Sequence, residues 1–266
     1  MGSLLTLLEK KKLIIAKGVA KSFEEIDLPK YMTSEALHPT IVDEPFPHVV
    51  IDNFFKPDIY SAIEKAFLAK LAQGLVNNSY EYNKFHTFDI DYDGYKFCPK
   101  GSWSDPNDPL YFFYSIAWND FFSKLFTQPT TINTSLAFHH HPPGDKTGFV
   151  HHDLANKYFD LRSRLPSGAI PCDFIPSSST PLNSIQIERR IIAILFYVAN
   201  PTWNEGDGGE TGLYSADKEK LLIKVPPVNN RLLAFHISNQ SMHAFQTNKL
   251  PRNCIVQWFH IPEALF

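Results

Sequence analysis

The sequence is poor in the features that mark disulfide-rich, nucleic-acid-binding and membrane-spanning proteins. Its 266 residues include only three cysteines, Cys98, Cys172 and Cys254, which lie far apart. Such spacing supports neither a disulfide framework nor a thiolate metal cluster, so we expect a protein of the reducing cytoplasm. The formal net charge of -3 gives no sign of a surface for nucleic acid. We therefore expect no nucleic-acid partner.

Long apolar runs are also absent from the sequence. No stretch is long enough to cross a bilayer, and residues 4–8 are too few for the apolar core of a signal peptide. We therefore expect no membrane partner. With 44% hydrophobic and 20% charged residues, the composition is that of an ordinary globular protein. Nothing in the sequence indicates the oligomeric state.

Proline and phenylalanine, in contrast, are abundant, with 20 and 22 residues. Both favour short strands and turns packed on aromatic layers over a helical bundle. Runs compatible with β-strands, separated by Pro, Gly, Asn or Ser, fill the C-terminal half. These runs are residues 132–141, 190–199, 210–214, 221–225, 231–237 and 253–260. Their spacing is typical of a jelly roll, and we expect an all-β core with flanking helices, an α+β arrangement.

The chain divides into an N-terminal extension, residues 1–44, and a core domain, residues 45–266. The extension shows no sustained periodicity, whereas the core begins with a strand in residues 45–54. Two amphipathic helices, one over residues 57–71 and one after Asp108-Pro109, are expected to buttress the sheet. Two loop-like segments, residues 77–107 and 157–188, are expected to form the rim and wall of a pocket that select the substrate.

A metal-binding pattern lies near the middle of the chain. Side chains alternate along an extended segment, so His151 and Asp153 face one side and His152 the other. A third ligand, His243, would complete a facial triad of two histidines and one carboxylate, which suits Fe(II) oxygen chemistry because it leaves coordination positions open. A closed zinc site would need a fourth protein ligand. The His-x-Asp pattern alone is more often structural, so its interpretation depends on its neighbours.

Arg252 supplies that context, because it follows His243 and opens an apolar strand. The planar guanidinium is the side chain best shaped to bind a carboxylate through two hydrogen bonds. An inward arginine beside a metal requires a buried anion. The far carboxylate of 2-oxoglutarate, whose keto-acid end chelates iron, would supply one.

Several further blocks accompany these residues in a recognisable order. They are residues 189–197, Trp203, residues 206–214, 226–235, 243–245 and 252–260. With these blocks, residues 45–262 resemble the iron(II)/2-oxoglutarate-dependent oxygenases of the prolyl-4-hydroxylase-like superfamily. The resemblance implies a double-stranded β-helix barrel, iron bound by His151, Asp153 and His243, and 2-oxoglutarate anchored by Arg252. It also implies that O2 and 2-oxoglutarate are consumed, that succinate is formed, that an unactivated C–H bond is hydroxylated, and that ascorbate is a candidate reductant.

The chain departs from the family pattern at Cys254, where many relatives carry a Ser or Thr that helps to bind the distal carboxylate of 2-oxoglutarate. A thiol is a weaker donor, so the second contact is expected from His141 or Tyr197, both on predicted strands. The run of histidines at 139–141 is better explained by packing or hydrogen bonding than by a second metal, because no carboxylate accompanies it.

Three functions remain open at this point. The favoured one is a hydroxylase of a small metabolite or amino-acid-like substrate. The carboxylate of Asp153 argues against a related halogenase, and Asp153→Gly is predicted to abolish hydroxylation. The second is a protein prolyl hydroxylase acting on a ribosomal or other protein target, because residues 45–54 resemble the entry strand of such enzymes. Many of these enzymes carry a second barrel, for which the chain is too short. The third is a non-enzymatic barrel that binds a metal or ligand, and formation of succinate would separate it from the other two.

Overall fold

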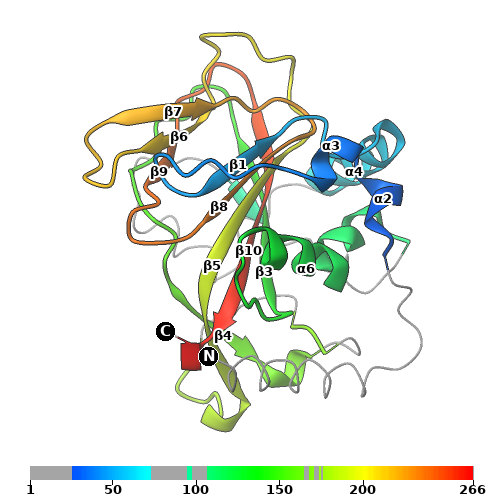
Figure 1. Ribbon diagram of the computed structural model, residues 1–266, viewed down its shortest axis with the longest axis vertical. Coiled ribbons are helices and arrows are strands. Elements are labelled where there is room, and N and C mark those ends of the chain that lie inside the picture. Colours follow the sequence, from blue (N-terminus) through cyan, green and yellow to red (C-terminus); the bar gives the residue numbers. More distant parts are fainter. Residues whose placement is uncertain are drawn as a thin grey trace.

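The computed structural model describes residues 26–72, 107–164, 168–170, 174 and 176–265, together with the backbone of residues 95–97 (Figure 1). Two antiparallel sheets form the centre of the molecule. The larger has the strand order β1-β8-β5-β10-β3-β2, with β4 paired to β5, and the smaller has the order β7-β6-β9. Their strands are β1 His48–Ile51, β2 Tyr95–Phe97, β3 Thr134–His141, β4 Asn156–Asp160, β5 Ile185–Tyr197, β6 Thr211–Tyr214, β7 Leu221–Val225, β8 Arg231–His236, β9 His243–Phe245 and β10 Arg252–Pro262. This arrangement confirms the predicted jelly roll.

The two faces of the larger sheet bury different parts of the core. On β5 the alternation of side chains places Ile194 and Phe196 in a cluster shared with the helices, whereas Leu195 and Tyr197 join a cluster shared with the smaller sheet. Figure 1 shows the helices and the smaller sheet on opposite sides of the larger sheet. The second cluster, which includes Leu213 of β6, lies beside the space in which the candidate site is formed.

The helices hold the larger sheet through aromatic side chains. They are α2 Leu28–Tyr31, α3 Ser34–Leu37, α4 Pro57–Leu71 and α6 Ile116–Leu125, and short 3-10 helices occupy η1 Pro109–Tyr114, η2 Leu161–Ser163, η3 Leu182–Ser184 and η4 Glu263–Leu265. The indole of Trp118 on α6 donates to Gln257 Oε1 on β10 at 2.7 Å, and Gln257 Nε2 donates to the Phe113 carbonyl at 2.6 Å. Because this buried amide has its partners, it ties α6 and η1 to the central strand without a desolvation penalty.

The helix expected at residues 57–71 is confirmed with those bounds. The second expected helix is divided. A 3-10 helix occupies Pro109–Tyr114, and α6 begins only after Ser115, whose side chain accepts a hydrogen bond from the Trp118 amide. A serine in this position is a strong N-cap, and it restarts the helix with a new buried face. Trp118 and Phe122 therefore lie deepest in the core.

Other predicted segments differ from the structure in informative ways. Within the predicted extension, residues 26–44 include two helical turns, and Met32 and Ala36 are buried against the core. The predicted loop 157–188 contains most of β4 and the first residues of β5, which form an antiparallel pair. Residues 1–25 and most of the segment 77–107 lie outside the described residues. The domain boundary at residue 45 stays a prediction.

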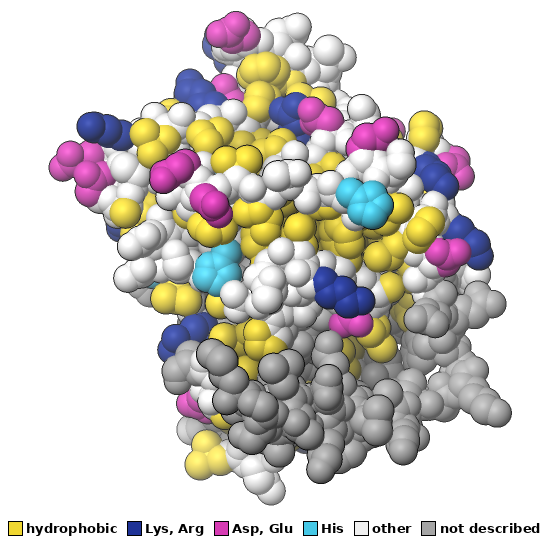
Figure 2. Space-filling view, viewed as in Figure 1, with side chains coloured by type: hydrophobic (Ala, Val, Ile, Leu, Met, Phe, Trp, Pro, Cys, Tyr) yellow, Lys and Arg dark blue, Asp and Glu magenta, His cyan; other side chains and the backbone are white. Residues whose placement is uncertain are grey.

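The surface of the described residues mixes both signs of charge. Figure 2 shows acidic and basic side chains interspersed over the coloured part of one face, in keeping with the formal net charge of -3. Within the described ranges, no helix combines the length and the apolar character that a membrane crossing requires.

Candidate active site

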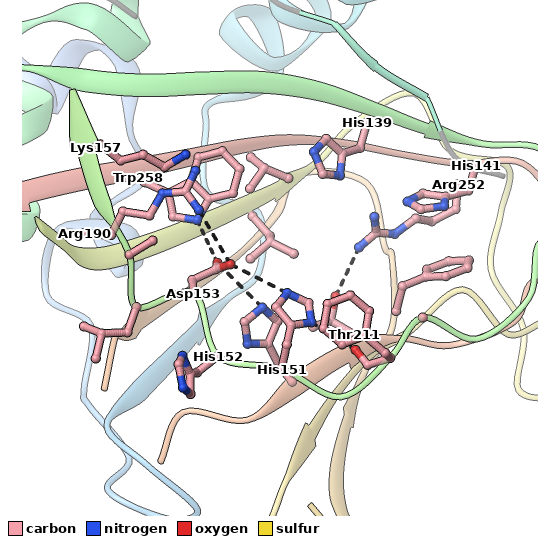
Figure 3. Close-up of a pocket in the computed structure, with 18 residues that line it drawn as sticks. His139, His141, His151, His152, Asp153, Lys157, Arg190, Thr211, Arg252 and Trp258 are labelled. Atoms are coloured by element: carbon pink, nitrogen blue, oxygen red, sulfur yellow. Dashed lines mark hydrogen bonds and ion pairs between the residues drawn. The ribbon is translucent and has the colours of Figure 1, made fainter. Parts of the chain in front are cut away.

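A pocket of about 360 Å³ opens between the two sheets, within the size range of small-molecule sites. It brings together side chains from β3, β4, β5, β6, β9, β10 and the segment before β4. Its lining consists of His139, His141, Gly148, Phe149, His151, His152, Asp153, Leu154, Ala155, Lys157, Arg190, Leu195, Thr211, His243, Phe245, Arg252, Val256 and Trp258. The lining is apolar over much of its area, with the charged groups placed in a few positions (Figure 3).

Three metal-capable side chains converge in this pocket. The backbones of His151 and His243 exchange two hydrogen bonds of 3.1 and 2.9 Å, which bring the segment before β4 alongside β9. As a result, Asp153 Oδ1 lies 3.6 Å from His151 Nε2, and Asp153 Oδ2 lies 3.6 Å from His243 Nε2. One ligand atom from each of the three residues lies within 4.8 Å of the others. The cluster has the donor atoms and spacing of a mononuclear metal site.

Backbone carbonyls fix the orientation of both imidazoles. His151 Nδ1 donates to the Phe149 carbonyl at 2.9 Å, and His243 Nδ1 donates to the Ser241 carbonyl at 3.0 Å. Since a carbonyl only accepts, each Nδ1 carries its hydrogen, and in the neutral ring Nε2 is left with the lone pair that faces Asp153. His152 lines the pocket but points away from the three converging atoms (Figure 3).

The carboxylate of Asp153 is ionised although it is buried. Burial opposes ionisation, but the adjacent imidazoles of His151 and His243 and the positive charge of Arg190 hold the pKa of Asp153 well below its ordinary value. The indole of Trp258 also donates to Asp153 Oδ2 at 2.7 Å. A fixed carboxylate anion is therefore present before any ligand arrives.

The two histidines differ in their protonation. Burial, reinforced by the charge of His151, lowers the pKa of His243 to about 4. Burial also disfavours the charged form of His151, but the adjacent carboxylate of Asp153 outweighs it and raises the pKa of His151 above its ordinary value. Near neutral pH, His243 is ready to act as a ligand, whereas a proton competes for His151.

Arg252 lies at the other end of the pocket, at the start of β10. Its side chain is 3% exposed, and the guanidinium donates to Thr211 Oγ1 and to Cys254 Sγ, each at 3.1 Å. The hydroxyl of Tyr197 donates to the same Thr211 oxygen at 2.7 Å. The guanidinium carbon lies 5.3 Å above the Tyr197 ring and 5.4 Å above the Phe245 ring. Neutral groups thus hold this cation in a fixed orientation.

His141 shares that end of the pocket, because it is the cross-strand neighbour of Arg252. Its Nδ1 hydrogen-bonds Asp145 Oδ2 at 2.9 Å, and its ring stacks on Phe245 with 4.0 Å between centroids. Burial and the charge of Arg252 hold the pKa of His141 well below its ordinary value. A neutral ring that donates from Nδ1 presents an acceptor, not a donor, at Nε2.

Four pocket residues were not singled out from the sequence: Thr211, Arg190, Lys157 and Trp258. Arg190 carried a usable signal, since it opens an apolar strand as Arg252 does. Lys157 belonged to a segment that was interpreted as a loop. Thr211 lies on a strand of four residues, β6, which is too short to show which face is buried. Trp258 lies in the block 252–260, in which only Arg252 and Cys254 were assigned a role from the sequence.

Comparisons with known proteins agree with this geometry. Residues 138–260 match the family model of the 2OG-Fe(II) oxygenase superfamily. The fold is similar to that of a Pseudomonas putida prolyl-4-hydroxylase, with 14% identity, a TM-score of 0.51, and coverage of 80% of this chain and 91% of that one. It is also similar to a Trichoplax adhaerens prolyl hydroxylase in complex with a peptide fragment of the hypoxia inducible factor oxygen degradation domain, with 15% identity, a TM-score of 0.50, and coverage of 80% and 83%.

No curated protein matches the chain, and at 14 and 15% identity the structural likeness concerns the fold. The family match is more specific, because residues 138–260 contain the three converging ligands and Arg252. Members of this superfamily are dioxygenases that use Fe(II), 2-oxoglutarate and O2. Residues 138–260 thus carry the 2OG-Fe(II) oxygenase domain, with all three candidate metal ligands and Arg252 inside it.

Proposed function

We propose that the protein hydroxylates an unactivated C–H bond of a small metabolite or amino-acid-like substrate, with iron bound by His151, Asp153 and His243. One observation carries the proposal. Two imidazole Nε2 atoms and a carboxylate converge in the same pocket as the buried guanidinium of Arg252. A cytoplasmic location, expected from the cysteine usage, belongs to the same proposal.

The donor set suits Fe(II). Imidazole nitrogen and carboxylate oxygen are its usual ligands in non-haem oxygenases, and the converging cluster contains three donors among the described residues. Three protein ligands leave room for 2-oxoglutarate and O2, whereas a structural zinc site is closed by a fourth. When bound, iron and 2-oxoglutarate supply the oxidation: O2 is consumed, 2-oxoglutarate loses CO2 to become succinate, and the substrate gains a hydroxyl group.

At the far end of the pocket, Arg252 would bind the distal carboxylate of 2-oxoglutarate. Thr211 is suited to make the second contact, which Cys254 would make only weakly. A hydroxyl oxygen has two lone pairs and one hydrogen. The Thr211 oxygen already accepts from Tyr197 and Arg252, so its own hydrogen can be donated to a carboxylate in the pocket. In this arrangement Tyr197 positions Thr211, while His141 forms the wall beside Arg252.

Protein prolyl hydroxylation is the second candidate function. It is favoured by the shared fold with the Trichoplax adhaerens prolyl hydroxylase, whose structure holds a peptide fragment. A peptide would have to enter past Phe149, which lines the pocket with 53% of its side chain exposed. The volume of about 360 Å³, which must also contain 2-oxoglutarate, favours the small substrate.

The test is formation of succinate by the full chain supplied with Fe(II), ascorbate, 2-oxoglutarate and O2. The proposal predicts slow decarboxylation of 2-oxoglutarate even without a substrate, so the assay does not require the substrate to be known. His243→Ala is expected to abolish the activity, because a ligand is lost. His38→Ala, at an exposed histidine outside the pocket, serves as the matched control and should retain the wild-type rate. Equal rates for the two variants, or no succinate from the wild type, would refute the proposed function.

A further inference from the structure

The turn between β9 and β10 leads directly into Arg252. It consists of residues 246–251, and Arg252 is the first residue of β10. The cross-strand partner of Arg252 is His141, the last residue of β3, and both side chains lie at the same end of the pocket (Figure 3). The last pair of a ladder opens more easily than the pairs inside it. The direction of Arg252 therefore depends in part on how this turn is held.

The side chain of Asn248 fastens the turn to the end of β3. Its Nδ2 donates to the Leu250 carbonyl at 2.7 Å, to the Pro142 carbonyl at 2.9 Å and, over a longer distance of 3.3 Å, to the His141 carbonyl. One amide thus joins the cross-strand partner of Arg252 to the residue two positions before Arg252. Asn248 is 3% exposed. Loss of a buried donor is costly, because its acceptors stay desolvated.

The backbone and Cβ of Asn248 are held from further sides. The carbonyl of Asn248 accepts from the Gly144 amide at 2.8 Å, and Asn248 forms an isolated β-bridge with Gly208. A Cβ placed on Gly209 would lie 3.4 Å from Asn248 Cβ and 3.4 Å from Arg252 Cγ. The side chains of Asn248 and Arg252 therefore pack on the same glycine, and a shift of the asparagine is transmitted to the arginine.

The Arg252 side chain consequently has two supports. Its guanidinium donates to Thr211 and Cys254, whereas its backbone is placed by the turn that Asn248 fastens. Asn248 is not among the described residues that line the pocket, so it can affect a ligand only through its neighbours. A guanidinium binds a carboxylate through two parallel hydrogen bonds only when its plane and direction are both fixed.

We infer that Asn248 is a positioning residue for the cosubstrate, because it sets the direction from which Arg252 meets the distal carboxylate of 2-oxoglutarate. The inference rests on the proposed function, in which Arg252 binds that carboxylate. Its effect should be confined to the distal carboxylate, since the backbone bonds between His151 and His243 hold the metal ligands independently of the Asn248 amide.

The experiment compares two keto acids by equilibrium binding to the full chain with Mn(II) in the absence of oxygen. They are 2-oxoglutarate and 2-oxobutanoate, which has the same keto-acid end but no distal carboxylate. The wild type should bind 2-oxoglutarate about a hundredfold more tightly, because only this ligand pairs with Arg252. Asn248→Ala should reduce the preference by about tenfold through weaker binding of 2-oxoglutarate. Binding of 2-oxobutanoate and of Mn(II) should be unchanged.

Asn119→Ala is the matched control for loss of a buried amide. Asn119 is 5% exposed, and its Nδ2 donates to the Thr131 carbonyl at 2.9 Å. It lies on α6, across the larger sheet from the smaller sheet (Figure 1), so its loss should lower stability and leave the preference as in the wild type. Asn248→Leu is a second variant, which keeps the branched outline of asparagine and introduces no charge. It should show the same loss of preference as the alanine variant if that variant does not fold.

The inference is overturned if a folded Asn248 variant keeps the wild-type preference or weakens binding of both keto acids alike. An equal loss of preference in Asn119→Ala also overturns it, because the effect would then be one of general stability. A wild type that binds both keto acids alike would overturn both the inference and the role of Arg252.

Formation of succinate by the wild type separates this inference from the proposed function. A reduced preference in the Asn248 variants, together with no succinate from the wild type, would refute the oxygenase function and leave the positioning role standing. Formation of succinate together with an unchanged preference in the variants would leave the oxygenase function standing and refute the positioning role.

Discussion

The two ends of the pocket hold their arginines in different ways. Arg252 donates to the neutral groups of Thr211 and Cys254, whereas Arg190 stacks on Trp258 and approaches the carboxylate of Asp153. Hydrogen bonds fix the direction of each donor, so the Arg252 end is suited to one ligand of constant shape. Stacking fixes only the plane of the guanidinium, so the Arg190 end can accept ligands of different outline. The cosubstrate 2-oxoglutarate always has the same shape, which suits the Arg252 end. A substrate of other outline would suit the Arg190 end.

The largest expected effect comes from removing the cation at the first end. Arg252→Gln should raise the KM for 2-oxoglutarate by about a hundredfold, because a buried charge pair with the distal carboxylate is lost. Arg190→Gln, at the other end of the pocket, should change this KM far less. Steady-state succinate assays at varied 2-oxoglutarate measure the effect, with the exposed Arg164→Gln as control. If the two variants raised the KM equally, the two ends would not be separate sites.

The sequence predicted the strands and the metal ligands, but only some of the residues that line the two ends of the pocket. Strands β3, β5, β8 and β10 were predicted because they contain β-compatible runs bounded by Pro, Gly, Asn or Ser, and the ligand pair was found because His151 and Asp153 are close in the chain. Lys157 was missed because β4 has five residues and polar ends, so the pairing with β5 that places it in the pocket leaves no trace in local periodicity. Thr211 was missed for a related reason. Its importance comes from Tyr197 and Arg252, which approach it from other strands.

Metal binding between the two ends is expected to depend on pH, because one proton competes with the metal for His151. The pKa of His151 is raised by Asp153, against the effect of burial, so lowering the pH through that raised pKa protonates a ligand and weakens metal binding. His243, whose pKa burial lowers to about 4, stays neutral over the same range. Mn(II) affinity should therefore fall by about tenfold per pH unit below the His151 pKa.

Calorimetric titration of the full chain with Mn(II) at a series of pH values measures this slope. A slope corresponding to two protons above pH 5 would mean that His243 titrates with His151, contrary to the different environments of the two rings. A pH-independent affinity would exclude His151 as a ligand.

Thr211→Val tests the hydroxyl at the first end with little change in shape. Loss of its donated hydrogen bond should raise the KM for 2-oxoglutarate by about tenfold, with kcat nearly unchanged because the metal ligands are not touched. Thr211→Ser retains the hydroxyl and should stay close to the wild type. If the valine variant had a normal KM, the second contact to the carboxylate would come from another group, and Cys254 would be the nearest candidate.

The smallest effect concerns Tyr197, and it decides between two roles for that residue. Its hydroxyl donates to Thr211 Oγ1 at 2.7 Å, and the side chain is fully buried. If Tyr197 acts only by orienting Thr211, Tyr197→Phe should raise the KM for 2-oxoglutarate by about threefold and add nothing in a Thr211→Val background. If Tyr197 contacts the carboxylate directly, as expected from the family resemblance, the two effects should multiply. The KM for 2-oxoglutarate is measured for the wild type, the two single variants and the double variant. Because a direct contact and a positioning role predict different KM values for the double variant, this double-mutant cycle separates the two roles even when each single effect is modest.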